Sequence, residues 1–266
     1  MKLAFIGGGN MGEAMLSAVL EKGLSTPQAV SVSDVDKERC DYLAREYSVA
    51  VTGSDRQAAE MGDVVVLAIK PQNLAEVMAE LDGQLKPAQL VLSIIAGAKI
   101  NTLSLGLKHG CIVRVMPNTP AQIGEGMSVW TATAEVTEQQ RGWASAILGA
   151  MGKELYVDDE RYIDMATAVS GSGPAYVFLF MESLVDAAVG IGLPRDMAKE
   201  LVLQTVLGSE RFAQKSGKEL AELRRMVTSP GGTTAEALLQ FEKGEFTDLV
   251  KQAVKAAYDK AKELGK

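Results

Sequence analysis

The sequence predicts an α/β fold in which a doubly wound parallel sheet is followed by an all-helical part. Three observations lead to this prediction. A short apolar run at the N-terminus ends in a cluster of glycines between Gly7 and Gly12. Apolar runs and helical patterns then alternate along the chain, which is typical of βαβ units. From about Arg161 onward the strand-like runs disappear, and helical spacing continues almost to the end.

The apolar runs of the first part are short and rich in valine, isoleucine and leucine, as expected for strands covered on both faces of a parallel sheet. We expect strands at Leu3–Ile6, Val30–Ser33, Val64–Ile69, Leu90–Ile95, Ile112–Met116 and Met127–Trp130. Helices are expected at Met11–Glu21, Lys37–Tyr47, Gln72–Leu81, Asn101–Leu105 and Thr137–Met151. Thr137 and Gln140 have the spacing of a capping box. A boundary near residue 160 divides the chain into domains at 1–160 and 161–266.

The glycine cluster has the spacing G-x-G-x-x-G and lies between a predicted strand and a predicted helix. In this setting Gly7 permits a sharp turn, Gly9 lets the backbone approach a pyrophosphate, and Gly12 lets the helix pack close to the strand. The start of the helix offers unpaired N–H groups and a partial positive charge to phosphates. The pattern predicts a Rossmann-type dinucleotide site, with a purely structural glycine turn as the alternative.

Composition excludes several classes of function. The 266 residues are 47% hydrophobic and 23% charged, and this length is enough for one large domain or two ordinary ones. A net charge of -7 provides no basic footprint for nucleic acid. Two distant cysteines and one histidine, His109, cannot build a zinc site, and we interpret His109 as a surface or helix-end residue. No apolar run approaches the length of a membrane span, and the first strand begins too early for a signal peptide, so we expect a cytoplasmic protein.

The end of the second predicted strand bears on the choice of cofactor. An acidic residue about twenty positions after the glycines bonds the adenosine ribose and disfavours a 2′-phosphate. Asp34 occupies this place and favours NAD. Against this, Ser33, Lys37 and Arg39 could hold a phosphate, and Asp36 could be the acidic residue or a helix cap. These residues leave NAD and NADP both open.

Three further strand ends carry candidate binding residues, because open α/β sheets bind ligands at the carboxyl ends of their strands. Lys70 follows the third apolar run and could meet a ribose or phosphate; a solvated loop lysine is the alternative. The turn 93–97 follows the next run. Asn118, held between Pro117 and Pro120, could position a nicotinamide or form an Asx-type turn.

Two segments rich in glycine and hydroxyl groups interrupt the helical part, at 170–174 and 228–234. Pro174 suits the first turn of a helix, and Thr233 with Glu236 has capping-box spacing. Either segment alone could be an ordinary loop. Because two such segments precede helices in one small domain and can form a backbone nest for a carboxylate, we interpret them as a substrate site. The helix around 177–188 is apolar on more than one face. This favours burial by a partner chain and predicts an obligate homodimer, with an internal helix as the alternative.

Together these motifs resemble one family, pyrroline-5-carboxylate reductase, along essentially the whole chain. The resemblance rests on Phe5-Ile6-Gly7-x-Gly9-Asn10-Met11-Gly12, on Ala68-Ile69-Lys70-Pro71 and on Met116-Pro117-Asn118-Thr119-Pro120. It is most specific at Ser170-Gly171-Ser172-Gly173-Pro174-Ala175-Tyr176 and at Val227-Thr228-Ser229-Pro230-Gly231-Gly232-Thr233-Thr234, which looks like the family's signature.

The resemblance implies reduction of 1-pyrroline-5-carboxylate to L-proline with NADPH or NADH, the last step of proline biosynthesis. It also implies a homodimer interlocked through the helical domain, and dimers of this family often gather into rings. Thr234 matches the threonine proposed to hydrogen-bond the ring nitrogen, which makes it the expected catalytic residue. The expected substrate-binding residues are Ser172, Ser229, Pro230, Gly231, Gly232, Thr233 and Thr234. The expected cofactor-binding residues are Gly7, Gly9, Asn10, Met11, Gly12, Ser33, Asp34, Asp55, Ala68, Lys70, Pro71, Ala96, Gly97 and Asn118.

The chain departs from the family pattern where the cofactor adenosine is expected. Many members carry Asn-Arg or a pair of serines after the second strand, which suits a 2′-phosphate, whereas this chain has Ser33-Asp34. Asp55 stands where asparagine is common. Both acids favour NADH over NADPH as the expected cofactor. One competing interpretation is a β-hydroxyacid dehydrogenase, which needs a lysine general acid on a helix of the second domain; the stretch from Ala175 to Glu182, after Pro174, contains none. Another is a nucleotide-sensing protein without turnover, whose helical part would lack a polar substrate site.

Overall fold

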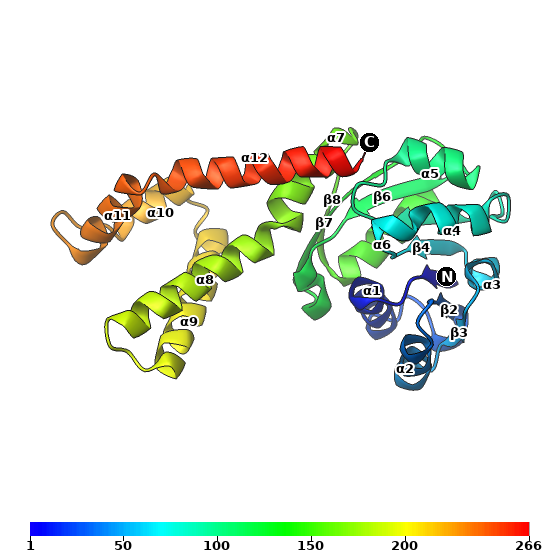
Figure 1. Ribbon diagram of the computed structural model, residues 1–266, viewed down its shortest axis with the longest axis horizontal. Helices are drawn as coiled ribbons and strands as arrows, with labels where there is room; N and C mark the ends of the chain where they lie inside the picture. The colour runs from blue at the N-terminus through cyan, green and yellow to red at the C-terminus, as the bar shows by residue number, and fades with distance from the viewer. Residues whose placement is uncertain (266) are drawn as a thin grey trace. The chain divides into compact units, whose positions relative to one another are not determined.

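The computed structural model describes residues 1–265, which form two compact units (Figure 1). The sheet unit comprises Met1–Ser172 together with the residues from Ala257 onward, and the helical unit comprises Gly173–Ala256. The expected boundary lies near residue 160, and the sheet unit continues beyond it through one more helix and a π-helical turn.

Within the described residues the sheet has eight strands in the order β3-β2-β1-β4-β5-β6-β7-β8. The strands are β1 (Leu3–Ile6), β2 (Val30–Ser33), β3 (Ala50–Thr52), β4 (Val64–Leu67), β5 (Leu90–Ser93), β6 (Ile112–Met116), β7 (Gly126–Ala132) and β8 (Gly152–Tyr156). Strands β1 to β6 pair in parallel, β7 runs antiparallel to β6, and β8 is parallel to β7. The strand order reverses beside β1, so the crevice that binds ligands in such sheets is expected at the carboxyl end of β1.

The helices of the sheet unit are α1 (Asn10–Glu21), α2 (Lys37–Tyr47), α3 (Asp55–Met61), α4 (Leu74–Leu81), α5 (Ile100–Leu107), α6 (Glu138–Ala150) and α7 (Arg161–Ala166). Short turns add η1 (Pro27–Ala29), η2 (Pro71–Asn73), η3 (Thr119–Ile123) and the π-helical η4 (Thr167–Gly171). The helical unit contains α8 (Gly173–Gly190), α9 (Arg195–Ser216), α10 (Leu220–Met226) and α11 (Thr233–Lys243). The last helix, α12 (Phe246–Leu264), begins in the helical unit and ends in the sheet unit.

Both faces of the sheet are covered. Along β1, Leu3 and Phe5 belong to one buried cluster with Met15 of α1. The alternate residues Ala4 and Ile6 belong to a second cluster, which includes residues of α4 and α5. The apolar residues of the strands are therefore used on both sides of the sheet, and the carboxyl ends of the strands form an edge where a site can lie.

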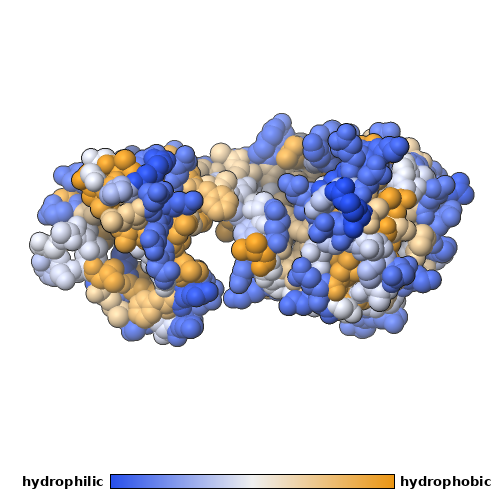
Figure 2. Space-filling view, turned by 90° about the horizontal axis from the view of Figure 1, so that it is seen from below, coloured by the Kyte–Doolittle hydropathy of each residue, from blue (hydrophilic) through white to orange (hydrophobic). Residues whose placement is uncertain are grey.

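The helical unit buries few of its own apolar side chains. Helices α8, α10 and α11 contain no fully buried residue, and α9 contains only Ala198 and Val202 among the described residues. Phe178 and Leu179 of α8 are 61% and 63% exposed. Figure 2 shows hydrophobic patches on the surface of these helices, at the left of the view. Exposed apolar surface of this extent marks an interaction site.

All six expected strands are confirmed to within a few residues, as are the five expected helices and the capping box of Thr137 with Gln140. The doubly wound sheet followed by a helical part is confirmed, but the expected parallel direction of the sixth predicted strand is wrong, because β7 is antiparallel to β6. The link from Met116 to Gly126 is shorter than the dozen or more residues that a parallel crossover needs. The strands β3 and β8 and the helix α3 were not expected.

Two other expectations are corrected. His109 directly follows the C-cap of α5, so the helix-end interpretation is confirmed. The surface alternative is wrong, because His109 is only 7% exposed and its Nε2 lies 2.8 Å from the carbonyl oxygen of Gln89. The helical run Arg161–Gly190 is long and apolar enough, by length and composition alone, to span a membrane, although no such run was expected. Only 6% of its most apolar window is buried inside the structure. The rest of its apolar surface is exposed and is expected to be covered by another molecule.

Arg114, in the middle of β6, explains why the sheet unit continues past residue 160. Its side chain is 2% exposed. Its Nη1 donates to Oε1 of Glu160 at 2.8 Å, and its Nη2 donates to Oδ1 of Asp164 at 2.7 Å. A buried arginine requires such partners, because an unpaired charge in the interior is strongly destabilising. The two ion pairs therefore fasten α7 to the sheet.

Replacing Arg114 with leucine should lower the free energy of unfolding by about 3 kcal/mol, because the two carboxylates lose their buried cation. Urea denaturation at a fixed protein concentration measures this change. The matched control is Arg161→Leu, because Arg161 pairs with Asp159 on the surface and its side chain is 83% exposed. We expect the control to leave stability nearly unchanged. Equal losses in both variants would contradict the role of Arg114.

Candidate functional site

The glycine turn after β1 is built by close backbone contacts and leaves open space at one point. Gly7 has a φ of +97°, and a Cβ there would lie 2.7 Å from the carbonyl oxygen of Ala68. A Cβ at Gly12 would lie 2.5 Å from the carbonyl oxygen of Gly7. Around Gly9, by contrast, no described atom lies within 4 Å of the Cβ position. Gly9 is the N-cap of α1 without a side-chain cap, so the first N–H groups of α1, from Asn10 onward, are available to a phosphate.

The turn is braced through the peptide groups of Gly8. Its N–H donates to Oδ2 of Asp34 at 2.7 Å, and its carbonyl oxygen accepts from Nε of Arg39. The other carboxylate oxygen of Asp34 accepts from the N–H of Asp36 at 2.9 Å. Asp36 itself caps α2 and accepts hydrogen bonds from the N–H groups of Glu38 and Arg39. Of the two roles considered for Asp36, the helix cap is therefore confirmed. Asp34 is thus the acid that lies next to the glycine turn.

A cluster on α1 and α2 holds this brace in place. Arg39 pairs with Glu13, and the hydroxyls of Tyr42 and Tyr47 each donate to Oε1 of Glu13 at 2.9 Å. Burial alone would raise the pKa of Glu13, but hydrogen bonds from Arg39, Tyr47 and Tyr42 outweigh it and lower the pKa below its usual value. Arg39 is therefore held as the cation of an ion pair.

A second acid lies at the carboxyl end of β2. The buried hydroxyl of Ser33 donates to Oδ1 of Asp55 at 2.6 Å, at the start of α3. Burial raises the pKa of the Asp55 carboxyl; the Ser33 hydrogen bond opposes this, and the charges of Glu80, Asp34 and Glu76 add to the rise. Two acids, Asp34 and Asp55, therefore lie at this end of the sheet.

Two other strand ends supply expected cofactor residues. Ala68 follows β4 and packs against Gly7, while Lys70 is exposed and precedes the turn η2, which begins at Pro71. After β5, Ala96 precedes Gly97, which has a φ of +78°. A Cβ at Gly97 would lie 2.8 Å from Cβ of Leu264, so the end of α12 packs directly on this turn.

Asn118, two residues beyond β6, uses both ends of its side chain within the sheet unit. Its Nδ2 donates to the carbonyl oxygen of Ser170 at 3.1 Å, and its Oδ1 accepts from the N–H of Met127 at 2.8 Å. Ser172 likewise bonds locally: its N–H and its hydroxyl both donate to the carbonyl oxygen of Thr167, at 2.8 and 3.0 Å. The structure thus places Ser172 in the sheet unit, next to the end of β6.

The loop 229–234 of the helical unit contains a tight turn. The N–H of Gly232 donates to the carbonyl oxygen of Ser229 at 3.0 Å, and Gly231 has a φ of +69°, as in a type II turn with Pro230 at its second position. Helix α11 starts at Thr233 with Gly232 as N-cap and no side-chain cap, so the expected capping box of Thr233 is wrong. Thr234 is half-buried in the first turn of α11.

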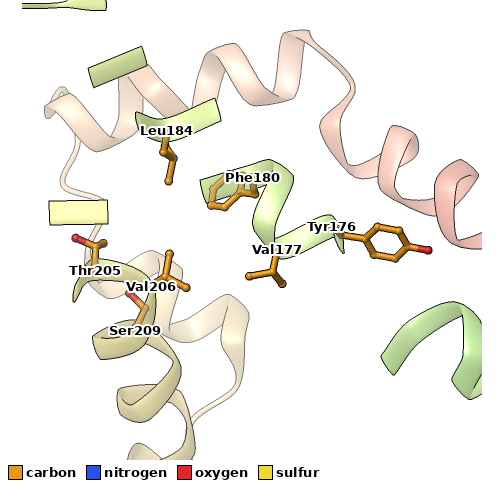
Figure 3. Close-up of a pocket in the computed structure, with 7 residues that line it drawn as sticks. All are labelled: Tyr176, Val177, Phe180, Leu184, Thr205, Val206 and Ser209. Atoms are coloured by element: carbon orange, nitrogen blue, oxygen red, sulfur yellow. The ribbon is translucent and has the colours of Figure 1, made fainter. Parts of the chain in front are cut away.

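A separate hollow lies between α8 and α9 (Figure 3). It has a volume of about 490 Å³ and is lined by Tyr176, Val177, Phe180, Leu184, Thr205, Val206 and Ser209. None of these side chains is charged, so the hollow suits apolar side chains better than a carboxylate. None of them was expected as a site residue.

Arg114 is the residue near the site that sequence reasoning missed. Its signal was visible as one arginine in the otherwise apolar run Ile112–Met116. Its acidic partners lie 46 and 50 residues further along the chain, which no local pattern reveals.

Comparison with known proteins identifies the family. The family described as "Pyrroline-5-carboxylate reductase dimerisation" matches residues 160–264, and "NADP oxidoreductase coenzyme F420-dependent" matches residues 2–97. The pyrroline-5-carboxylate reductase of Synechocystis is 41% identical over 266 residues, which cover 100% of this chain and 99% of the relative. That of Pseudomonas aeruginosa is 43% identical over 264 residues, with 99% and 96% covered.

Solved structures agree with this assignment. Pyrroline carboxylate reductase from Plasmodium falciparum, solved with NADP bound, has a TM-score of 0.92 and 34% identity, and 100% of this chain and 98% of that chain are covered. The enzyme from Coxiella burnetii has a TM-score of 0.90 and 37% identity, with the same coverage. On this identity along its whole length, the chain belongs to the pyrroline-5-carboxylate reductase family.

Proposed function

We propose that this protein reduces 1-pyrroline-5-carboxylate to L-proline with a nicotinamide dinucleotide, the last step of proline biosynthesis, in the cytoplasm. The observation that carries the proposal is the glycine turn, with open space over Gly9 and free N–H groups at the start of α1, in a member of this family. The rival, a β-hydroxyacid dehydrogenase, needs a lysine on α8, and α8 has none. We assign dinucleotide binding to residues 1–160 and substrate binding and dimerisation to residues 161–266.

The cofactor site in this proposal runs along the carboxyl ends of the strands. The pyrophosphate lies over Gly9 with Asn10, Met11 and Gly12 around it. The adenosine ribose meets the acids after β2 and at the start of α3. The remaining contacts come from Ala68, Lys70, Pro71, Ala96 and Gly97 at the next two strand ends.

The chemistry requires positioning more than a strong acid. When bound, the reduced nicotinamide supplies a hydride to the imine carbon, and one proton must reach the ring nitrogen or be there already. If the iminium form binds, no acid with a shifted pKa is needed. Holding the two reactants in attack geometry lowers the barrier by roughly 7–11 kcal/mol. The protein's task is then to hold the carboxylate, the ring and the cofactor in place.

The loop 229–234 supplies the substrate contacts in this proposal. The type II turn and the uncapped start of α11 present backbone N–H groups that suit a carboxylate. Ser172, Ser229 and Thr233 add hydroxyls. Thr234 hydrogen-bonds the ring nitrogen through its own hydroxyl.

Replacing Thr234 with valine removes this hydroxyl and keeps the shape of the side chain. We expect kcat to fall about tenfold or more, since one lost hydrogen bond in the transition state is worth about 1–2 kcal/mol. The affinity for the dinucleotide, measured by fluorescence titration, should stay nearly constant. Thr102→Val, at an exposed position on α5, is the control. Full retention of kcat in the Thr234 variant would refute the role.

We propose a preference for NADH over NADPH. Asp34 beside the glycine turn and Asp55 bonded to Ser33 both oppose a 2′-phosphate by charge. Arg39 cannot easily offset them, because it is already paired with Glu13.

Replacing Asp34 with serine should raise the ratio of kcat/KM for NADPH to that for NADH, by about tenfold if the charge acts at close range. Steady-state kinetics with both cofactors measure the ratio, which cancels any general weakening from the lost brace on Gly8. Asp36→Ser is the matched control, because serine can also cap α2. An unchanged ratio in the Asp34 variant would remove Asp34 from the ribose site.

We propose that the exposed apolar helices form a homodimer, and that dimers assemble further into a ring. The family match over 160–264 and the exposed side chains of α8 support this. It also gives the apolar run Arg161–Gly190 a protein partner in place of lipid.

Replacing Phe178 with glutamate should weaken the dimer, because a charge in an apolar interface loses its hydration. Analytical ultracentrifugation across a range of concentrations is the measurement, and circular dichroism checks that the helices remain. Leu105→Glu, which changes an exposed residue of α5 in the sheet unit, is the control. A Phe178 variant that dimerises as tightly as the wild type would place the interface elsewhere.

A further inference from the structure

The long helical run from Arg161 to Gly190 is interrupted where α7 meets α8. The N–H of Ser172 donates to the carbonyl oxygen of Thr167 at 2.8 Å, a bond between residues five apart, as in a π-helix. Two positions later comes Pro174, which has no N–H. In a regular α-helix the residue at 174 would donate to the carbonyl of Ser170. Pro174 therefore cannot supply the N–H that this carbonyl would accept in a regular α-helix.

The side chain of Asn118 supplies a donor to this carbonyl. Its Nδ2 lies 3.1 Å from the Ser170 oxygen, while its Oδ1 is fixed by the N–H of Met127 at 2.8 Å. The proline-flanked loop that carries Asn118 restricts the backbone around it. The amide therefore links the end of β6 and the start of β7 to the break in the helix.

Two further contacts fix the helix break against β6. A Cβ at Gly171 would lie 3.0 Å from Cε of Met116, so the π-turn packs on the last residue of the strand. On the N-terminal side of the turn, Arg114 of the same strand holds Glu160 and Asp164. The π-turn is therefore held from one strand, at the carboxyl edge of the sheet.

From these contacts we infer that Asn118 is a positioning residue: its side-chain amide replaces the N–H that Pro174 lacks and so fixes Ser170–Ser172 at the edge where the reaction takes place. This inference rests on the proposed function, because the residue that Asn118 positions, Ser172, is a proposed substrate contact. It gives Asn118 a role other than direct contact with the nicotinamide. Loss of the amide donor therefore affects hydride transfer and leaves cofactor affinity intact.

The test is Asn118→Asp, which keeps the shape and the acceptor for Met127 and removes the donor to Ser170. We expect kcat to fall about tenfold, the size of one lost hydrogen bond that is partly shielded from water. The dissociation constant of the cofactor should change by less than about twofold. The deuterium isotope effect with 4-deuterated cofactor should rise, as hydride transfer becomes slower than product release. The control Asn101→Asp changes an exposed asparagine on α5.

A double-mutant cycle with Pro174→Ala makes the inference specific, because alanine restores the backbone N–H at position 174. In this background Asn118→Asp should cost less than about twofold in kcat, since the Ser170 carbonyl has a new donor. An equal loss in both backgrounds overturns the inference. So does a tenfold rise in the cofactor dissociation constant with kcat unchanged, which would make Asn118 a cofactor ligand.

Measuring the free energy of unfolding of the same two single variants and the double variant separates this inference from the proposed function. If the wild type did not reduce pyrroline-5-carboxylate, the proposed function would fail, while a coupling between positions 118 and 174 in stability would still support the hydrogen-bond replacement. Additive effects of the two substitutions on stability would overturn it.

Discussion

The close approach of the glycine turn to the end of β4 is the steric constraint on which the edge of the sheet depends. A side chain at Gly7 would collide with the Ala68 carbonyl, and one at Gly12 would collide with the Gly7 carbonyl. Because both positions lack a Cβ, α1 begins directly beyond β1 and its free N–H groups lie at the carboxyl edge of the sheet. Affinity for phosphate is therefore provided by the backbone. A chain with a net charge of -7 needs no basic patch to bind a dinucleotide at this edge.

The helical unit, in contrast to the sheet unit, has almost no buried core of its own. Its four complete helices contain two buried residues among those described, both on α9. By length and composition the run into α8 could equally suit a membrane, but α8 carries Glu182 and Asp186, which are costly in lipid. The whole-length relationship to pyrroline-5-carboxylate reductases, with a dimerisation family over 160–264, favours a second protein chain as the cover. Folding of this unit and assembly are then one process.

The strands and site residues that could be predicted are those whose signal lies within a short stretch of the sequence. Strands β1, β4 and β5 are buried at every position and consist almost wholly of apolar residues, so they form runs that stand out. Strand β3 is exposed or half-buried along its length, and β8 alternates between half-buried and exposed, so neither has such a run. The direction of β7 was accessible from the short link after Met116. Of the candidate site, the glycine turn is local and was predicted in detail. The partners of Arg114, and the Ser170 carbonyl that accepts from Asn118, lie about fifty residues away and were not.

Asn118 and Pro174 lie in separate sequence motifs but are linked through the Ser170 carbonyl, to which Asn118 donates and Pro174 cannot. Pro174 helps to start α8, but it cannot offer an N–H to the partly buried Ser170 carbonyl, and a carbonyl shielded from water without a donor is unfavourable. Asn118 can repair this only from a rigid loop at the end of β6, because a mobile amide would lose more entropy than the bond returns. The prolines on either side of Asn118 provide that rigidity. Two motifs that look independent in the sequence therefore describe one structural element, and a change in either alters what the other must supply.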